Sequence, residues 1–318
     1  MSKLPNFKGK AFLAPMAGVS DPAFRLLCVE SGASLVVTEL TSIHAVVALE
    51  KQLKAQKKKI TDFIEYSKKE RPISVQLFGS DIDLTLKAAK IVEPYFDIID
   101  FNMGCPAPHI TAQMAGAALL TEPNHMEKLF KKLVDCVNIP VTLKMRAGVG
   151  PSNCYLWKPM AKIAESAGIS MITFHPRTVK QGYSGKADWN LIKELRSEVS
   201  KKIPIVGNGD IRSPEDAKKM IAQTGCDYVM IGRGAMGNPG LFNQVNSYLK
   251  TEKYAPVSKE EQITAFFKYL DYTKNYPTIK FSNIRTQAMY FSKGIVGGGK
   301  LRVKIGKTNS VEQLRKLF

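Results

Sequence analysis

Short apolar runs recur along the chain, and each is followed by a turn and a longer stretch with apolar residues at helical spacing. The runs cover residues 12–14, 35–38, 73–77, 98–101, 141–145, 171–174, 203–206 and 228–231. Continuous apolar runs of this length are typical of strands buried on both faces, and their alternation with helices indicates a parallel sheet. Eight β/α units in about 240 residues predict a (β/α)8 TIM barrel of the α/β class.

Helix-start signals follow several of these runs. Asp81 precedes a stretch with helical apolar spacing that continues to Val92, and the segment 213–216 reads Ser-Pro-Glu-Asp. A capping residue, a proline and acidic residues in the first turn favour a helix there. The alternative is a doubly wound sheet, which normally carries a G-x-G-x-x-G turn after its first strand, whereas residues 14–18 read Ala-Pro-Met-Ala-Gly.

The alternation of short apolar runs and helical stretches ends after residues 238–242, and the sequence of the rest of the chain predicts helices. Ser258 and Glu261 form a capping-box pattern that opens a helix to Tyr272, and 282–293 is a second candidate. The glycines at 297–299 are expected to break the chain before a last basic helix near Ser310. We therefore predict a barrel at residues 1–243 and a small all-helical domain at 244–318.

The chain is strongly basic, with a formal net charge of +18. Residues 244–318 hold 14 Lys and Arg against 5 Asp and Glu, so about a quarter of the chain carries half of the excess. Such a balance favours a polyanion such as nucleic acid as partner. The alternative is a solvated basic surface, as in lysine-rich heat-adapted proteins.

The cysteines indicate neither disulfides nor a metal site. There are five, at positions 28, 105, 136, 154 and 226, with no C-x-x-C pair and no Cys/His cluster. No stretch approaches the roughly 18 apolar residues of a membrane span, and no apolar leader precedes the first strand. We expect a cytoplasmic protein without metal or membrane contact, and no protein partner is implied.

Polar residues gather where the predicted strands end, which is where TIM barrels bind their ligands. The apolar strand at 98–101 runs directly into a Gly/Pro-broken turn that displays an Asn and a Cys. The candidates are Pro15, Met16, Ala17 and Gly18 after the first strand, Gln76, Asn102, Cys105, Lys144, Arg146, and His175, Arg177 and Thr178 after the sixth.

The loops after strands 7 and 8 suit a phosphate. They read Gly-Asn-Gly-Asp at 207–210 and Gly-Arg-Gly-Ala-Met-Gly at 232–237, and small residues there expose backbone N–H groups. Lys144 lies in an apolar barrel strand, so its ammonium should face an anion or an electron-rich ring. Together with Gln76 these features describe an FMN site. A phosphorylated sugar is the main alternative ligand, but it would give the turn at 15–18 and Cys105 no evident role.

Cys105 is a candidate general acid, because a thiol on a catalytic-face loop can give up a proton. Cys28, Cys136 and Cys226 are expected to be small buried hydrophobes. His175 could be a core histidine, but its place beside Arg177 favours the site. Arg146 and Arg177 are candidates for holding a substrate phosphate or a base edge.

Several of these segments, in order, resemble the tRNA-dihydrouridine synthase family. They are residues 14–21 (Ala-Pro-Met-Ala-Gly-Val-Ser-Asp), 75–79, 102–106 (Asn-Met-Gly-Cys-Pro), 141–146, 175–178 (His-Pro-Arg-Thr), 207–211 and 231–234. The resemblance implies an FMN barrel with a helical tRNA-binding domain that uses NADPH to reduce uridines. It implies that the residues at the FMN are Pro15, Met16, Ala17, Gly18, Gln76, Lys144, His175, Asn208, Gly209, Asp210, Gly232 and Arg233. Cys105 would be the proton donor, with Asn102, Arg146, Arg177 and Thr178 at the substrate.

The expected chemistry is hydride transfer from reduced flavin to C6 of uracil and protonation of C5 by Cys105. Two alternatives remain open at this point. One is a flavin barrel that acts on a free pyrimidine, as dihydroorotate dehydrogenases do, which needs no basic appendage. The other is an RNA-binding protein whose barrel has lost its chemistry. The aromatic residues of the tail, such as Phe267 and Tyr269, are expected to be core more often than stacking platforms.

Overall fold

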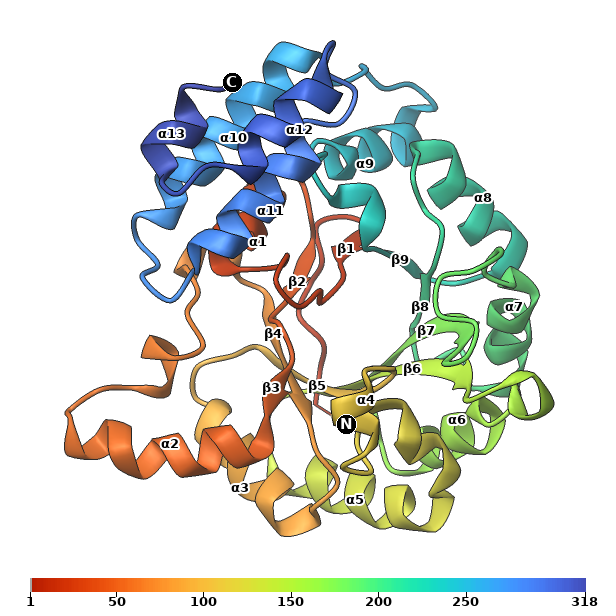
Figure 1. Cartoon of the computed structure of the whole chain (residues 1–318). Helices are drawn as coiled ribbons and strands as arrows, with labels where there is room; N and C mark the ends of the chain where they lie inside the picture. Colours follow the sequence, from red (N-terminus) through yellow and green to blue (C-terminus); the bar gives the residue numbers. More distant parts are fainter. Residues whose placement is uncertain (1) are drawn as a thin grey trace.

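A closed parallel β-barrel forms the body of the protein (Figure 1). The computed structural model describes residues 2–318. The barrel strands are β1 (Ala11–Leu13), β2 (Leu35–Val37), β4 (Ile73–Phe78), β5 (Ile98–Met103), β6 (Val141–Gly148), β7 (Met171–Thr178), β8 (Ile205–Asn208) and β9 (Tyr228–Ile231). β1 pairs with both β2 and β9, and β2 pairs with β4, which closes the ring. The predicted TIM barrel is confirmed.

Four of the strands extend further than predicted, and one short strand is additional. β4 and β5 end at Phe78 and Met103, and β6 and β7 continue to Gly148 and Thr178. Arg146 and the segment 175–178 therefore lie at the carboxyl ends of strands. β3 (Thr41–Ser42) pairs with the end of β4. A two-residue strand is too short to leave a periodic signal in the sequence.

The barrel is filled by a small cluster of inward-facing side chains. The cluster comprises Phe12, Ala14, Leu35, Val37, Ile98, Met171, Val206 and Met230. The ring of Phe7 lies 4.8 Å from the ring of Phe12 and 5.4 Å from that of Tyr228, so the N-terminal segment covers the amino end. The amino end is therefore packed shut, and the carboxyl end remains available for a site.

Helices surround the strands as the apolar spacing predicted. They are α1 (Pro22–Glu30), α2 (Ile43–Ala55), α3 (Ile82–Val92), α4 (Pro108–Thr111), α5 (Pro123–Cys136), α6 (Trp157–Ser166), α7 (Trp189–Glu198), α8 (Pro214–Thr224) and α9 (Leu241–Thr251), with 3₁₀ turns η1 (Ile60–Asp62), η2 (Lys68–Glu70), η3 (Gly116–Thr121), η4 (Pro151–Asn153) and η5 (Arg233–Ala235). The predicted caps are confirmed, because Asp81 accepts from Leu84 N and Ser213 from Asp216 N.

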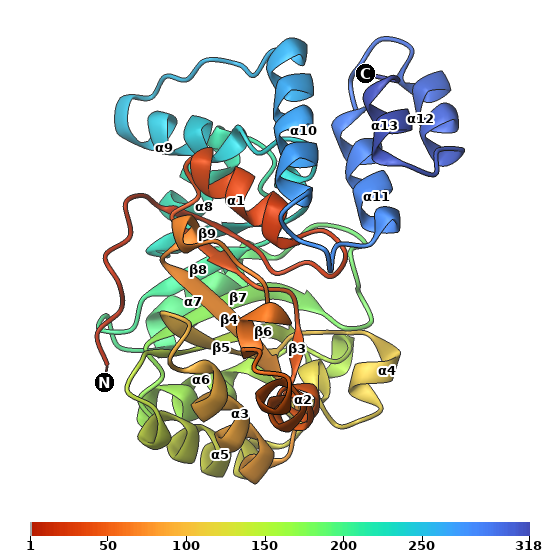
Figure 2. The same cartoon turned by 90° about the vertical axis from the view of Figure 1, so that its left-hand side faces the viewer.

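Four further helices lie together beside the mouth of the barrel (Figure 2). They are α10 (Lys259–Thr273), α11 (Phe281–Phe291), α12 (Gly298–Gly306) and α13 (Val311–Arg315). The Ser258 capping box and the last helix after Ser310 are confirmed. The expectation for the glycines at 297–299 is wrong: Gly297 has a φ of 72° and caps α12, which starts inside the glycine run.

The helical region is anchored on the barrel. The predicted boundary at 243/244 falls inside α9, which packs on α8 and β1 as the eighth helix of the barrel. We therefore place the start of the helical region after Thr251. The side chains of Phe266 and Tyr269 are fully buried, and the ring of Phe266 lies 5.4 Å from that of Phe291 and 4.4 Å from that of Phe318. As predicted, these aromatic residues form the core of the region.

Within residues 2–318, no helix is long and apolar enough to cross a membrane. In the same part of the chain, no group of three or more His, Cys, Asp or Glu is placed to hold a metal ion.

Candidate active site

A cavity of about 1330 Å³ opens at the carboxyl end of the barrel and extends to the helical region. Its wall includes most of the residues that the sequence singled out. These are Pro15, Met16, Ala17, Asn102, Cys105, Lys144, Arg146, His175, Asn208, Gly209, Asp210, Gly232 and Arg233. The predicted strand ends thus meet around one space, as parallel barrel strands require.

Four predicted site residues lie behind this wall, where they hold other residues in place. Gln76 is fully buried in the barrel, and Arg177 and Thr178 are buried in β7. The N–H of Gly18, at a φ of 71°, donates to Glu39 Oε1 over 2.5 Å. These four residues do not line the cavity in the described part of the chain, residues 2–318, and their assignment to ligand contacts stays a prediction.

The Cys105 turn is held by a buried chain of hydrogen bonds. Asn102 Oδ1 accepts from the N–H groups of Gly104 and Cys105 at 3.1 and 2.9 Å, and Asn102 Nδ2 donates to Gln76 Oε1 at 2.9 Å. Gln76 Nε2 in turn donates to Asp100 Oδ2 at 2.6 Å. Because Asn102 is fixed on both sides, Cys105 is presented to the cavity on a rigid turn.

Asp100 is a supporting residue that the sequence reading missed. Its other carboxyl oxygen accepts from Thr142 Oγ1 at 2.6 Å, and burial raises the pKa of this carboxyl. The available signal was an acidic residue inside an otherwise apolar strand, which requires partners.

Lys144 and His175 lie on neighbouring strands at the floor of the cavity. Burial, with a further contribution from Arg146, lowers the pKa of Lys144 to about 8, and its Nζ donates to Asn208 Oδ1 at 3.3 Å. Burial and the surrounding cations lower the pKa of His175 well below its usual value, so its ring is neutral near pH 7. One N–H group of Arg177 points at His175 Nε2 over 3.4 Å. Since a guanidinium only donates, this contact places the imidazole proton on Nδ1.

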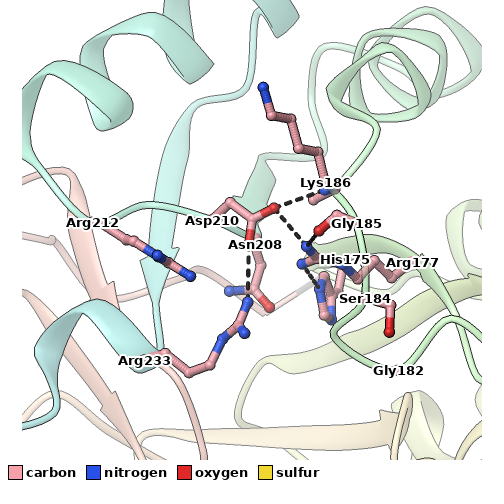
Figure 3. Close-up of polar contacts among 12 residues, drawn as sticks. His175, Arg177, Gly182, Ser184, Gly185, Lys186, Asn208, Asp210, Arg212 and Arg233 are labelled. Atoms are coloured by element: carbon pink, nitrogen blue, oxygen red, sulfur yellow. Dashed lines mark hydrogen bonds and ion pairs between the residues drawn. The ribbon is translucent and has the colours of Figure 1, made fainter.

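Asp210 joins the loops on one side of the cavity (Figure 3). Its Oδ2 accepts from Arg177 and from the N–H of Ala187, both at 2.7 Å, and its Oδ1 accepts from Arg233 at 3.0 Å. Burial raises the pKa of this carboxyl, but the Arg177 and Ala187 hydrogen bonds outweigh it, and the net pKa is lowered. Asp210 therefore stays ionised and fixes two arginines, Arg177 of β7 and Arg233 of η5.

Tyr183 and Arg212 also line the cavity and were not singled out in the sequence. Tyr183 is 61% exposed, and the guanidinium carbons of Arg233 and Arg146 lie 4.3 and 5.8 Å from its ring centroid. Arg146 itself donates to the carbonyls of Gly104, Thr178 and Gly182, so it links two loops. A lone Tyr in a loop gives no sequence signal of this kind.

The helical region contributes one side of the cavity. Lys259, Gln262, Tyr290 and Lys293 all line it. Gln262 Nε2 donates to the carbonyls of Phe291 and Lys293 at 2.6 and 3.1 Å, and Lys259 Nζ donates to Gln262 Oε1 at 3.1 Å. These residues are more than 150 positions from Cys105 in the sequence, so sequence reasoning could not bring them to one site.

The other cysteines differ from Cys105 in their surroundings. Cys28 and Cys226 are buried as predicted, and burial raises the pKa of both thiols. Cys136, predicted to be buried, is half-buried at the end of α5, and Cys154 is half-buried in a loop. Of the five, only Cys105 lines the large cavity within residues 2–318.

The residues present fit an FMN cofactor. A side chain at Gly209, which has a φ of 130°, would place its Cβ 2.8 Å from Ala187 Cβ and 3.2 Å from His175 Cδ2. Beside it, Arg212 and Arg233 reach toward the same space from neighbouring loops (Figure 3). A glycine-lined pocket with two guanidinium groups suits a phosphate, and the Lys144 ammonium suits an electron-rich ring.

The fold and this site together define a TIM-barrel enzyme whose mouth is built for an anionic ligand. A chain of histamine dehydrogenase from Rhizobium sp. 4-9 shares the fold, with a TM-score of 0.55 and 15% identity over 74% of this chain and 45% of that one.

The sequence comparisons give the family. The family model described as dihydrouridine synthase (Dus) matches residues 12–315. The tRNA-dihydrouridine synthase B of Shewanella oneidensis is 38% identical over 87% of this chain and 85% of its own length. A probable tRNA-dihydrouridine synthase of Rickettsia conorii is 35% identical over 97% and 92%. The chain belongs to the dihydrouridine synthase family and is an oxidoreductase.

Proposed function

We propose that the protein is an FMN-dependent tRNA-dihydrouridine synthase that reduces the C5=C6 bond of specific uridines with NADPH as reductant. The observation that carries this proposal is the meeting of Cys105 and Lys144 in one cavity that is also lined by glycines and arginines. A weak acid is thereby combined with a site for an anionic, ring-containing cofactor. The relatives described above bear the same activity in their names.

Each part of the cavity would hold a different part of the ligands. Gly209, Gly232, Arg212 and Arg233 would take the cofactor phosphate, and Lys144 would place a positive charge at its ring. Pro15, Met16 and Ala17 also line the cavity, and Met16 lies beside Gly232. When bound, FMN supplies the hydride for C6 of the uracil ring.

The protein's own chemical contribution is the proton. The Cys105 thiol would donate its proton to C5, which leaves a thiolate that solvent reprotonates. Asn102 fixes the backbone of the Cys105 turn, so the thiol keeps its place while the base enters and leaves. The neutral His175 lines the same cavity and adds no positive charge to it.

The basic helical region favours RNA over a free pyrimidine as substrate. A base in folded RNA reaches the cavity only if it leaves its stack, which costs a few kcal/mol. Contacts between phosphates and cations can supply that free energy. Lys259 and Lys293 lie on the cavity wall itself, where a single small substrate would not need them.

Incubation of the protein with FMN, NADPH and unmodified tRNA, followed by mapping of dihydrouridine along the RNA, tests the proposal. We expect the product at a defined tRNA position, and no reaction of free uridine. Reduction of free uridine or dihydroorotate chemistry without tRNA would contradict it. A colourless protein that gains neither flavin absorbance nor activity with added FMN would indicate an RNA-binding protein whose barrel has no catalytic activity.

A further inference from the structure

A ridge of five lysines covers the end of α2 and the segment that follows it, away from the helical region. This lysine ridge consists of Lys51, Lys54, Lys57, Lys58 and Lys59, and all five side chains are exposed. Residues 51–59 contain no acidic residue. In the described part of the chain, Lys54 alone among them forms an ion pair, with Glu50 on the same helix.

The ridge stands at a fixed distance from the cavity. Leu40 lines the cavity, Ser42 caps α2, and the helix then runs from Ile43 to Ala55. Thirteen residues at about 1.5 Å each carry the chain roughly 20 Å outward. α2 packs on α3, so this outward direction is set by the body of the barrel.

The ridge and the helical region lie on opposite sides of the mouth. In Figure 1 α2 projects from the lower part of the barrel while α10–α13 lie at the top, and Figure 2 shows the same separation from the side. The helical region presents its own exposed cations, including Lys293, Lys300, Arg302 and Lys304. The cavity thus opens between two basic surfaces.

The local structure explains a lysine at only one position of the ridge. A lysine in the last turn of a helix is favoured by the helix dipole, which gives Lys54 a role. That effect fades within one turn, and the three consecutive lysines after the helix repel one another. An extended polyanion would relieve this repulsion, and a nucleic acid that enters the cavity must extend beyond its rim.

We propose that the lysine ridge is a second RNA-contact surface, which holds the substrate backbone on the side of the mouth opposite α10–α13. This inference rests on the proposed function, because it takes the RNA to be the molecule that enters the cavity. Double-stranded nucleic acid carries about one charge per 1.7 Å. The ridge extends over residues 51–59, so a nucleic acid that passes it presents several phosphates to these lysines. The two surfaces together would hold the RNA across the mouth while one nucleotide is extruded.

The test compares two variants with equal charge change. In the ridge variant Lys54, Lys57, Lys58 and Lys59 are each changed to Gln. In the control Lys3, Lys8, Lys201 and Lys202 are each changed to Gln. The control lysines are exposed and lie on the N-terminal segment and on the loop before β8, at the amino end of the barrel. Thermal unfolding and flavin absorbance establish that both variants are folded.

Affinity for tRNA is measured by filter binding at several salt concentrations, and kcat and KM by product formation. For the ridge variant we expect roughly tenfold weaker binding and a log–log salt slope reduced by about 0.7 to 0.9 for each lost contact. KM for tRNA should rise while kcat is unchanged. Wild-type affinity and slope in the ridge variant, or an equal loss in the control, would overturn the inference.

The two proposals fail separately. If wild-type protein binds tRNA through the ridge but forms no dihydrouridine, the proposed function is wrong and the inference about the ridge stands. If dihydrouridine forms and the ridge variant has the wild-type KM for tRNA, the inference about the ridge is wrong and the proposed function stands.

Discussion

The side-chain amide of Gln287 donates to the carbonyl oxygen of Val19 over 2.7 Å, in the buried contact between α11 and the loop that joins β1 to α1. α11 also lies against the loop after β9: a Cβ at Gly237 would come within 2.3 Å of Tyr290 O. Both loops line the cavity. The helical region therefore holds the cavity in shape as well as presenting positive charge.

Changing Gln287 to Met should weaken flavin binding. The Val19 carbonyl loses its partner in a buried place, which costs about 1–3 kcal/mol, or roughly 5- to 150-fold in affinity if the loop moves in response. Gln287 Oε1 is itself buried without a partner among residues 2–318, so global stability should fall less than flavin affinity. Flavin titration and thermal unfolding measure the two effects. Thr286→Ala, one position away, is the control, and equal flavin affinity in both variants would contradict the role of Gln287.

Flavin binding should also depend on pH through Lys144. Its pKa of about 8 means that the ammonium loses its proton as pH rises through that value in the ligand-free protein. Affinity for an anionic cofactor should therefore be highest below pH 8 and fall above it. Lys144→Arg keeps a positive charge and should bind flavin without this inflection, whereas Lys144→Met should bind weakly at every pH. The same inflection in all three proteins would show that another group titrates.

Asp210→Asn should destabilise the fold, because the guanidinium of Arg177 is 1% exposed and would lose its charged partner. Because the Asp210 side chain is 23% exposed and Asn keeps an acceptor oxygen, the cost should be about 1–3 kcal/mol, below that of breaking a fully buried pair. In the wild type the pKa of Asp210 is lowered by folding. The carboxylate therefore contributes to the free energy of unfolding at pH values above its pKa in the unfolded chain. This contribution is lost as pH falls through its pKa in the folded protein. Denaturant unfolding near pH 7 measures the loss. Asp83→Asn, at an exposed position of α3, should leave the unfolding free energy within about 0.5 kcal/mol of wild type.

The strands and the clustering of their ends could be predicted because burial on both faces leaves continuous apolar runs. The residues at those ends, such as Asn102 and Cys105, then had to meet. The polar ends of β6 and β7 lie beyond the predicted apolar runs because Arg146 and His175 interrupt the apolar pattern, although the backbone pairing continues through them.

Other features depend on tertiary contacts that a sequence pattern does not contain. α12 starts in a glycine run, because its packing on α11 offsets the low helix propensity of Gly. The hydrogen bonds of the Gln76 amide to Asp100 and Asn102 join three residues of two strands, and the sequence does not show that they meet. Tyr183 lies against Arg146 of β6 and Arg233 of η5, which come from distant parts of the sequence.

The most direct test of the central claim follows one turnover with Cys105 intact and removed. Reduced, flavin-loaded protein is mixed without oxygen with unmodified tRNA, and flavin oxidation and dihydrouridine formation are followed together. Wild type should oxidise one flavin for each dihydrouridine formed. Cys105→Ala should keep its flavin and its tRNA affinity but react slower by a factor on the order of 10² to 10⁴, whereas Cys154→Ala should match wild type. An unchanged rate in Cys105→Ala would contradict the assignment of this thiol as the proton donor.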